Sequence, residues 1–383
     1  MKVRQFVNLV TEKCSGRFYD EFMDKAIGGL YTLRRIKADK LFYGSTEEAL
    51  QKESEQEAMA ADPCKKEMVR SRLPNPLINF NQSRPVDGRT DFWPFYGAAN
   101  QSSKILCLDA AGQAVLYDAG DGALETLPCL RAPMGGERDD PVVLSVALPG
   151  GTQDPARPDA LYVMDKRHGS FEALIYGDPS PYRLGHCVWW WRQLPMPPFA
   201  RDPTHGSIVA YALLADDDGG TICVSSYTDK VGTYCFNTAS ERWIRVGSWT
   251  LPFHGRGQVV PELDGLCFGV ASQYPCHMCA VDLSSISTDS ARRPKLRHQW
   301  EVMDTPAGWS ATNVSMSYMG AARFCIAKSF YIDGQDEDEM VLNGVEVVRE
   351  NNGARTSKSK HRFRMIKHKS IRYRLRNHRI RLL

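Results

Sequence analysis

Apolar residues along this chain come in short runs separated by polar turns, and this arrangement recurs over most of its length. Residues 233–237, for example, form one such run, and a second run begins after a polar turn at Trp243. Runs of about four to eight residues rich in β-branched and aromatic side chains, bounded by Gly, Asp or Asn, are typical of β-strands. Asn343-Gly344 predicts one further turn, within residues 341–348. The pattern predicts a chain built almost entirely of antiparallel strands.

Several of these strands end on a short acidic or amide side chain, which we call an anchor residue. The anchors are Asp118, Asp165, Asn237 and Asp282, which lie 47, 72 and 45 residues apart. Strand repeats with a period of roughly 40–50 residues are typical of β-propeller blades. A carboxylate or amide at the end of a strand can accept hydrogen bonds from nearby backbone amides, so we interpret the anchors as turn-forming residues.

A large apolar residue follows each anchor and begins the next strand. It lies six positions after the first three anchors, at Leu124, Phe171 and Trp243, and an insertion delays the fourth to Trp300. Large apolar side chains dominate the packing energy of protein cores. We therefore expect these residues to fill the space between neighbouring sheets.

The strand units along the chain account for five blades, and strands expected at residues 3–10 and 30–36 either complete the last blade or form a sixth. We expect an all-β, kelch-like propeller of five to six blades. Residues 1–44 would supply N-terminal strands to the closing blade. Residues 45–73 would form a charged helical insertion or linker, and residues 74–383 the propeller body, including a basic C-terminal strand.

A helix is predicted between residues 46 and 61. Ser45 and Glu48 have the spacing of a capping box, in which the Ser side chain accepts a bond from a backbone amide and the Glu reaches back to another. The following residues are mostly Glu, Gln, Ala and Lys as far as Asp62-Pro63, and no face of the helix is strongly apolar. We expect this helix to be exposed and to lie outside the hydrophobic core.

Composition places the chain among globular proteins. Hydrophobic residues make up 43% of the 383 residues, which is enough for a packed core. The eleven cysteines are an odd number and several lie inside apolar runs, which fits buried thiols in a reducing compartment better than a disulfide framework. The sequence shows neither the roughly 18 apolar residues of a membrane span nor the apolar core of a signal peptide. We expect a monomeric intracellular protein, cytoplasmic or nuclear, without membrane contact.

The net charge of +3 hides an uneven distribution. Residues 351–383 contain twelve Lys or Arg and no acidic residue, whereas the rest of the chain has 36 basic and 45 acidic residues. Residues 371–376 alternate apolar and basic side chains, which predicts a half-buried final strand in the closing blade. Its exposed face would carry Arg372, Arg374 and Arg376, a surface for an anionic partner such as RNA or an acidic protein.

Residues 177–202 interrupt the strand pattern with a Pro-rich segment that contains Trp189, Trp190 and Trp191. We expect this segment to be extended. Adjacent side chains of an extended segment point to opposite sides, so at least one of the three indoles should be partly exposed. Two interpretations stay open: packing of a crossover against two blades, or an interaction surface, because Trp is frequent at binding hot spots.

Few residues suggest chemistry. Cys276 and Cys279 have the spacing of a zinc-binding pair, but no second pair follows at a usable distance. The acidic runs at residues 216–218 and 333–339 lack the alternating ligands of a calcium-binding loop. The nine His are not grouped with Tyr as a copper site would need, and neither a phosphate-binding Gly loop nor Gly-x-Ser-x-Gly occurs. We expect no metal, no cofactor and no catalytic residue.

Residues 236–243 resemble the second half of a kelch repeat, in which an acidic or amide residue precedes a Trp by six positions, although the usual Gly-Gly of the preceding strand is missing. More closely, the chain resembles a large grass-plant family of uncharacterised proteins with kelch-like or galactose-oxidase-like propeller character. The resembling stretches include residues 4–10, 31–43, 161–165, 171–174, 249–253, 324–328 and 365–373. The resemblance implies an intracellular plant protein of unassigned function and transfers no catalytic or binding residue.

The sequence predicts a non-enzymatic protein-interaction module, by analogy with propellers that lack a recognisable site. Two alternatives stay open. A binder of nucleic acid or of an acidic partner would use one continuous exposed patch formed by Arg372, Arg374, Arg376 and neighbouring basic residues. An enzyme would bring His, carboxylate or Tyr side chains together at one mouth of the central channel.

Overall fold

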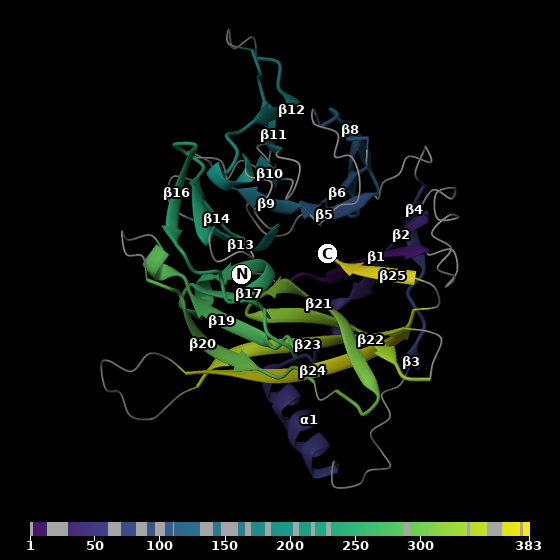
Figure 1. Ribbon diagram of the computed structural model, residues 1–383. Coiled ribbons are helices and arrows are strands. Elements are labelled where there is room, and N and C mark those ends of the chain that lie inside the picture. Colours follow the sequence, from purple (N-terminus) through teal and green to yellow (C-terminus); the bar gives the residue numbers. More distant parts are fainter. Residues whose placement is uncertain are drawn as a thin grey trace.

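The computed structural model describes residues 3–13, 30–59, 70–81, 90–95, 104–109, 111–130, 141–146, 160–164, 170–180, 185–201, 207–215, 219–226, 231–286, 292–303, 305–334, 338–350, 362–375 and 378–383. Within these parts nearly all regular structure is β-strand, as the hydrophobic pattern predicts. The strands form sheets arranged in a ring around a common centre (Figure 1). The fold is therefore a β-propeller.

Two of the sheets are separate four-stranded meanders, in which each strand pairs with the next one in the sequence. One has the order β5-β6-β7-β8 and the other the order β12-β11-β10-β9. Their strands are β5 (Asp91–Phe95), β6 (Lys104–Leu108), β7 (Ala114–Asp118), β8 (Leu124–Leu127), β9 (Val142–Val146), β10 (Ala160–Met164), β11 (Phe171–Gly177) and β12 (Val188–Gln193). Neighbouring strands are antiparallel, so short connections are enough to join them.

Two further meanders share one eight-stranded sheet, because the strands β13 and β17 pair in parallel with Tyr211 opposite Arg256. The strands are β13 (Ile208–Leu214), β14 (Thr221–Ser226), β15 (Thr233–Asn237), β16 (Arg242–Gly247), β17 (Phe253–Val260), β18 (Leu266–Ala271), β19 (Met278–Asp282) and β20 (Lys295–Trp300). Both β13 and β17 lie on the side of their meanders that faces the centre of the ring (Figure 1). This pairing places Tyr211 and Arg256 side by side on the two inner strands.

The next sheet has the order β21-β22-β23-β24-β3. Its strands are β21 (Trp309–Gly320), β22 (Arg323–Ile332), β23 (Glu339–Arg349), β24 (Phe363–Arg374) and the short β3 (Arg70–Ser71), which is parallel to β24. The expectation that residues 371–376 complete the closing blade is wrong, because β24 pairs with β23. An alternating pattern shows that one face of a strand is buried, but it does not say which strand is the neighbour.

The remaining sheet joins early and late parts of the chain in the order β25-β1-β2-β4. Its strands are β25 (His378–Leu382), β1 (Phe6–Lys13), β2 (Leu30–Lys37) and β4 (Pro76–Asn81). β25 is antiparallel to β1, with Leu382 opposite Leu9. Hydrogen bonds between a late strand and an early strand close the ring, which protects strand edges that would otherwise be open.

Apolar side chains from neighbouring sheets pack together and form the core. The rings of Phe171 and Phe236 lie edge to face with centroids 5.0 Å apart, and Trp243 lies 5.0 Å from Phe236. Across another interface between sheets, Phe268 and Phe324 are also 5.0 Å apart. The prediction that the residues after the anchors fill the gaps between sheets is thus confirmed for Phe171 and Trp243.

The anchor residues within the described parts form the predicted turns. In each, a side-chain oxygen accepts a hydrogen bond from a backbone N–H two or three residues later, at 2.7 to 3.2 Å: Asp118 from Gly120, Asn237 from Ser240, and Asp282 from Ser284. Asp165 lies outside the described residues. These bonds satisfy backbone donors at the ends of strands, which explains the recurrence of Asp and Asn there.

Two local expectations are wrong. The side chain of Leu124 is 56% exposed, because β8 is the outer strand of its meander. Asn343-Gly344 is not a hairpin turn but lies within β23, where the pairing with β24 has an irregularity. A Cβ atom on Gly344 would lie 2.2 Å from the carbonyl oxygen of Leu41, so glycine is needed here for close packing of two backbones.

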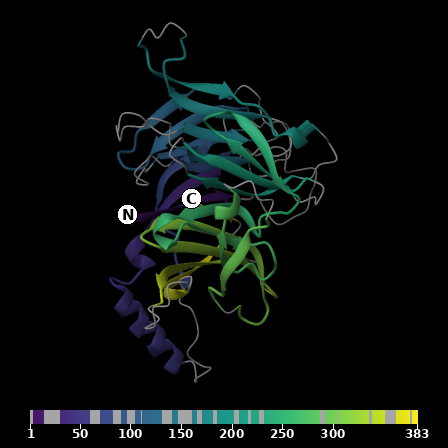
Figure 2. The same cartoon turned by 90° about the vertical axis from the view of Figure 1, so that its left-hand side faces the viewer.

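The helix α1 (Thr46–Met59) extends away from the ring (Figures 1 and 2). Its base packs against β24, where Ala49 is buried and Glu53 forms an ion pair with Arg364 at 2.9 Å. In the capping box, the Glu48 N–H donates to Ser45 Oγ at 3.2 Å, and Glu48 Oε2 accepts from the Gly44 N–H at 2.9 Å. Residues 50–55 of α1 are half-buried or exposed.

Short 3-10 helices occur at η1 (Ala38–Lys40), η3 (Pro198–Arg201), η4 (Pro261–Leu263) and η5 (Ser284–Ile286). In η4, Pro261 occupies the first turn, where a missing backbone N–H costs nothing. None of the helices in the described parts of the chain has the length and apolar character needed to cross a membrane.

Candidate functional site

A cavity of about 360 Å³ lies between the inner strands of the sheets, and we call it the axial cavity. Each sheet contributes an inner strand to its lining: β5, β9, β13, β17, β21 and β25. The polar and charged side chains around it include Arg4, Glu12, Tyr31, Tyr211, His254, Arg256, Gln258, Asn313, Arg379 and Arg381. Binding sites are commonly cavities of roughly 300–1,000 Å³ with a few convergent polar groups. The axial cavity is therefore the candidate functional site.

The basic side chains of β25 reach the cavity because this strand is the inner strand of its sheet. In the register with β1, Arg379 is opposite Glu12 and Arg381 is opposite Val10. Residues two apart on a strand share a face, so the two arginines belong to one face of β25. The intervening Ile380 is partly buried against the core.

One of these arginines is neutralised inside the protein. Arg381 Nη1 lies 3.1 Å from Asp91 Oδ1, and Asp91 is only 1% exposed. Burial of a carboxylate without a partner is costly, so the ion pair stabilises this part of the cavity wall. Arg381 is consequently committed to β5, the strand that holds Asp91.

Glu12 is held in the wall by a chain of hydrogen bonds. The buried hydroxyl of Tyr31 donates to Glu12 Oε1 at 3.2 Å and accepts from the Thr90 N–H at 3.1 Å. Because the backbone donor uses a lone pair of the phenol oxygen, the hydroxyl hydrogen is directed to the carboxylate. The chain places one negative charge at a defined position on β1.

Arg379 is the exposed arginine of this set. It lines the axial cavity and makes no hydrogen bond or ion pair with any residue that the structure describes. A guanidinium has five N–H donors in a planar fork, which matches the two oxygens of a carboxylate or phosphate. Arg379 therefore offers donors that the described residues of the chain do not use.

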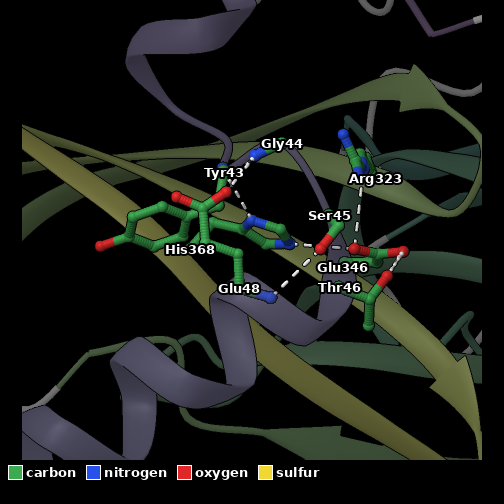
Figure 3. Close-up of polar contacts among 8 residues, drawn as sticks. All are labelled: Tyr43, Gly44, Ser45, Thr46, Glu48, Arg323, Glu346 and His368. Carbon is green, nitrogen blue, oxygen red and sulfur yellow. Dashed lines mark hydrogen bonds and ion pairs between the residues drawn. The ribbon is translucent and has the colours of Figure 1, made fainter.

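A second polar region lies at the base of α1, and we call it the His368 cluster: Tyr43, Thr46, Arg323, Glu346 and His368 (Figure 3). His368 Nδ1 accepts from the Tyr43 N–H at 3.1 Å, and His368 Nε2 lies 3.0 Å from Glu346 Oε2. Since Nδ1 is an acceptor, the ring proton is on Nε2 and is donated to Glu346. Thr46 Oγ1 donates to the other oxygen of Glu346 at 3.1 Å.

The His368 cluster is a structural junction. The side chain of His368 is fully buried, and Glu346 is 9% exposed. Burial raises the pKa of Glu346, but the His368 hydrogen bond, Arg323 at 3.6 Å and Thr46 outweigh it, so that the pKa lies below its usual value. These contacts fix the segment before α1 onto β23 and β24.

The expectation that Arg372 belongs to an exposed arginine patch is wrong. Arg372 is only 7% exposed; its Nη2 donates to Glu339 Oε1 at 2.9 Å and its Nε donates to Oε2. The guanidinium also lies 4.6 Å from the ring centre of Trp309. Arg374 is exposed, whereas Arg376 lies outside the described residues. Arg372 is a packing residue, because a buried acid and an aromatic face satisfy its charge.

The three tryptophans belong to β12, the outer strand of its sheet, and not to an irregular crossover. Trp189 Nε1 donates to Glu125 Oε1 at 2.9 Å and Trp191 Nε1 donates to the Pro128 carbonyl at 2.8 Å. Trp190 is half-buried. Two of the three indoles are therefore committed to packing against the neighbouring sheet.

Cys276 is half-buried and Cys279 is buried in β19, where burial raises the pKa of its thiol to about 12. Among the residues that the structure describes, no group of three or more His, Cys, Asp or Glu is placed to hold a metal ion. The acidic run at residues 216–218 lies outside the described parts, as do residues 335–337 of the second run. Glu339, at the end of that run, is buried against Arg372.

Residues 4–373 match the model of a family described as "Protein of unknown function (DUF1668)". The chain belongs to this family. A comparison with curated protein sequences gave no match. The match includes strands from every sheet of this DUF1668 protein but ends before β25. The family model therefore includes most of the inner strands around the axial cavity.

Two solved structures are similar to this DUF1668 protein. One is the β-propeller domain of Cps50 (Swd1) from Myceliophteria thermophila, with 14% identity, a TM-score of 0.36, and coverage of 77% of this chain and 76% of that chain. The other is a structural genomics protein of unknown function from Bacteroides thetaiotaomicron, with 10% identity, a TM-score of 0.36, and coverage of 83% and 79%. We transfer no role from either protein.

Tyr211, His254 and Arg379 belong to no recognisable motif, and the fold brings them to the axial cavity. For Arg379 the sequence does contain a local pattern. Residues 378–382 read His-Arg-Ile-Arg-Leu, which is the same alternation of basic and apolar residues as in residues 371–376. That pattern predicts a separate strand. Tyr211 and His254 lie in ordinary strand sequences, and only their position on inner strands distinguishes them.

Proposed function

We propose that this DUF1668 protein is a non-enzymatic protein-interaction module, a kelch-like propeller with six blades whose partner binds at the axial cavity. The proposal is supported by the convergence of side chains from the inner strands of all the sheets on one cavity. Strands hold side chains more precisely than loops do, which favours recognition of one specific partner.

The residue types around the axial cavity fit a protein partner. The lining includes Tyr211, Arg256 and Arg379, which are half-buried or exposed. Trp, Tyr and Arg are the residues most often found to dominate binding energy at protein interfaces. Aromatic side chains supply contact area at little cost in conformational entropy, and arginine supplies directed donors.

A site-specific cross-link tests the proposal. A photo-reactive phenylalanine analogue replaces Tyr211 in the intact chain, and the matched control carries the analogue in place of Tyr331, which is 44% exposed on β22. After irradiation in an extract of the cells that make the protein, we expect a discrete protein adduct from position 211 that an excess of unmodified chain prevents. The same adducts from both positions, or none from position 211, would overturn the proposal.

One observation favours an enzyme as a second candidate function. His254, Glu12, Tyr31 and Tyr211 line the same cavity, and these are the residue types that general acid–base chemistry uses. The test is incubation of the extract with the intact protein or with the His254→Ala variant, followed by mass spectrometry of small molecules and of captured proteins. A time-dependent chemical change that requires His254 would support an enzyme, and no change with either protein would reject it.

A further inference from the structure

Arginines outnumber carboxylates around the axial cavity. Arg4, Arg256, Arg379 and Arg381 line it, and Glu12 is the carboxylate side chain in the lining. Asp91 lies behind the wall and is paired with Arg381. A main-chain oxygen of Leu383, which also lines the cavity, accepts a hydrogen bond from Ser317 Oγ at 3.2 Å. A concave site whose walls carry charges mostly of one sign concentrates the electric field and attracts the opposite charge.

Resting on the proposed function, we propose that the axial cavity recognises carboxylates, and that the partner segment bound there is rich in Asp and Glu. Arg379 is the principal contact. It is exposed in the cavity, and the residues described by the structure leave its guanidinium donors unused. The planar fork of arginine binds a carboxylate through two parallel N–H···O bonds, which gives both strength and orientation.

The neighbourhood of Arg379 favours a carboxylate over a phosphate. Glu12 is opposite Arg379 in the pairing of β25 with β1, and the Tyr31 hydroxyl holds it in place. A fixed negative charge beside the binding arginine repels a dianion more strongly than a monoanion. A carboxylate side chain carries a single charge, so it is tolerated beside Glu12 better than a phosphate group is.

The size and position of the cavity favour a peptide over a nucleic acid. A space of about 360 Å³ surrounded by strands from every sheet can take a few side chains, but it offers no extended groove along a sugar–phosphate backbone. Arg372 of β24 does not extend the site, because it is buried against Glu339. The arginines of the axial cavity line a concave site of limited size, as needed for an acidic peptide segment.

The test is a binding titration of the intact chain with a fluorescent octaglutamate peptide, and octaglutamine of the same length is the neutral control. The variants are Arg379→Glu and Arg379→Lys, and Arg242→Glu is the matched control because Arg242 is an exposed arginine on the outer strand β16. Circular dichroism and thermal melting establish that all variants are folded. Inorganic phosphate and an eight-nucleotide oligothymidylate serve as competitors.

We expect octaglutamate to bind and octaglutamine not to bind. Arg379→Glu should weaken binding at least about tenfold, as loss of a charge-assisted contact does, whereas Arg242→Glu should change it less than about twofold. Arg379→Lys should fall between, because lysine keeps the charge but loses the fork. Binding should weaken as salt concentration rises.

The failures of this inference and of the proposed function are distinguishable. If the cross-link at position 211 captures a protein but octaglutamate does not bind, or binds equally to Arg379→Glu, the carboxylate inference is wrong and the interaction module stands. If octaglutamate binds through Arg379 but no protein is captured, the cavity recognises carboxylates and the proposed function fails. If oligothymidylate displaces the peptide and binds more tightly, a nucleic-acid ligand replaces the inference.

Discussion

Arg372 and Arg379 come from the same basic stretch of sequence, and the fold treats them in opposite ways. Arg372, on β24, is buried between the carboxylate of Glu339 and the ring of Trp309. Arg379, on β25, is exposed in the axial cavity and is not bonded to any residue that the structure describes. One arginine stabilises a sheet, and the other is available to a ligand.

The difference comes from the place of each strand in its sheet. β24 lies between β23 and β3, so its side chains meet those of neighbouring strands, and Arg70 on β3 shares Glu339 at 2.9 Å. β25 is an inner strand, and one side of it faces the cavity. A count of basic residues therefore overstates the cationic surface, because a buried ion pair contributes no free charge.

Removal of the acid that neutralises Arg372 should have the largest effect on the free energy of unfolding. Glu339→Ala leaves the buried Arg372 without its partner, and breaking such a pair costs about 3–5 kcal/mol of stability. Urea denaturation measures the change. A control variant, Glu339→Met combined with Arg372→Met, removes both charges and should recover most of the loss. A loss below about 1 kcal/mol in Glu339→Ala would contradict the role of the ion pair.

A backbone contact in the same sheet gives the next largest effect. In Gly344→Ala the new Cβ meets the Leu41 carbonyl, and overpacking of this kind costs about 1–3 kcal/mol. Gly177→Ala is the matched control, since a Cβ there has nothing within 4 Å. Thermal unfolding of both variants measures the difference. Equal melting temperatures would show that the segment before α1 does not pack tightly on β23.

The His368 cluster provides a smaller effect that depends on pH. The pKa of Glu346 is lowered in the folded protein, so its charged form stabilises the fold above the ordinary carboxyl pKa of about 4.3, and this contribution is lost as pH falls through the lower folded value. Glu346→Gln should cost about 1 kcal/mol at neutral pH. Denaturation between pH 7 and 3 should show a smaller decrease in the variant than in the wild type.

One result of the pH titration would contradict the predicted role of Glu346. If wild type and Glu346→Gln lose stability in parallel over the whole pH range, the charge of Glu346 does not stabilise the junction. Glu55→Gln serves as the control, because the Glu55 side chain is 42% accessible and has a helical ion-pair partner, Lys52. Surface pairs of this kind contribute less than about 1 kcal/mol, so this variant should resemble the wild type.

The smallest expected change is in the stability of Arg379→Ala. Because Arg379 has no bonded partner among the described residues, its removal should alter the free energy of unfolding by less than about 0.5 kcal/mol. The same urea titration that measures Glu339→Ala checks this value. A loss as large as that of Glu339→Ala would mean that Arg379 is structural and that the two arginines do not differ.

Much of the strand pattern could be predicted from the sequence, because alternation and turn residues are local properties. Asp118, Asn237 and Asp282 accept from nearby backbone amides as their positions predict. Gly344 shows the limit of such reasoning. Its sequence neighbours favour a turn, but the position is determined by Leu41, about 300 residues earlier in the chain.

The candidate site was less accessible to sequence reasoning. Glu12, Tyr31, Tyr211, His254 and Arg379 come from separate strands, and no motif connects them. The sequence directed attention to Arg372 and the tryptophans instead, because clusters of charge or aromatic residues are conspicuous in one dimension. The fold buries Arg372, Trp189 and Trp191, and their polar atoms bond to Glu339, Glu125 and the Pro128 carbonyl.

The amino-acid sequence by itself determined the all-β character, the repeated turns with their acidic or amide anchors, and the charged helix with its capping box. Each depends on residues within one turn or one strand, where backbone geometry and side-chain type are enough. The tertiary structure alone decided which strands are inner strands, how β25 joins β1, and which arginines keep a free charge. These features depend on contacts between distant segments, and a local pattern carries no information about its distant neighbour.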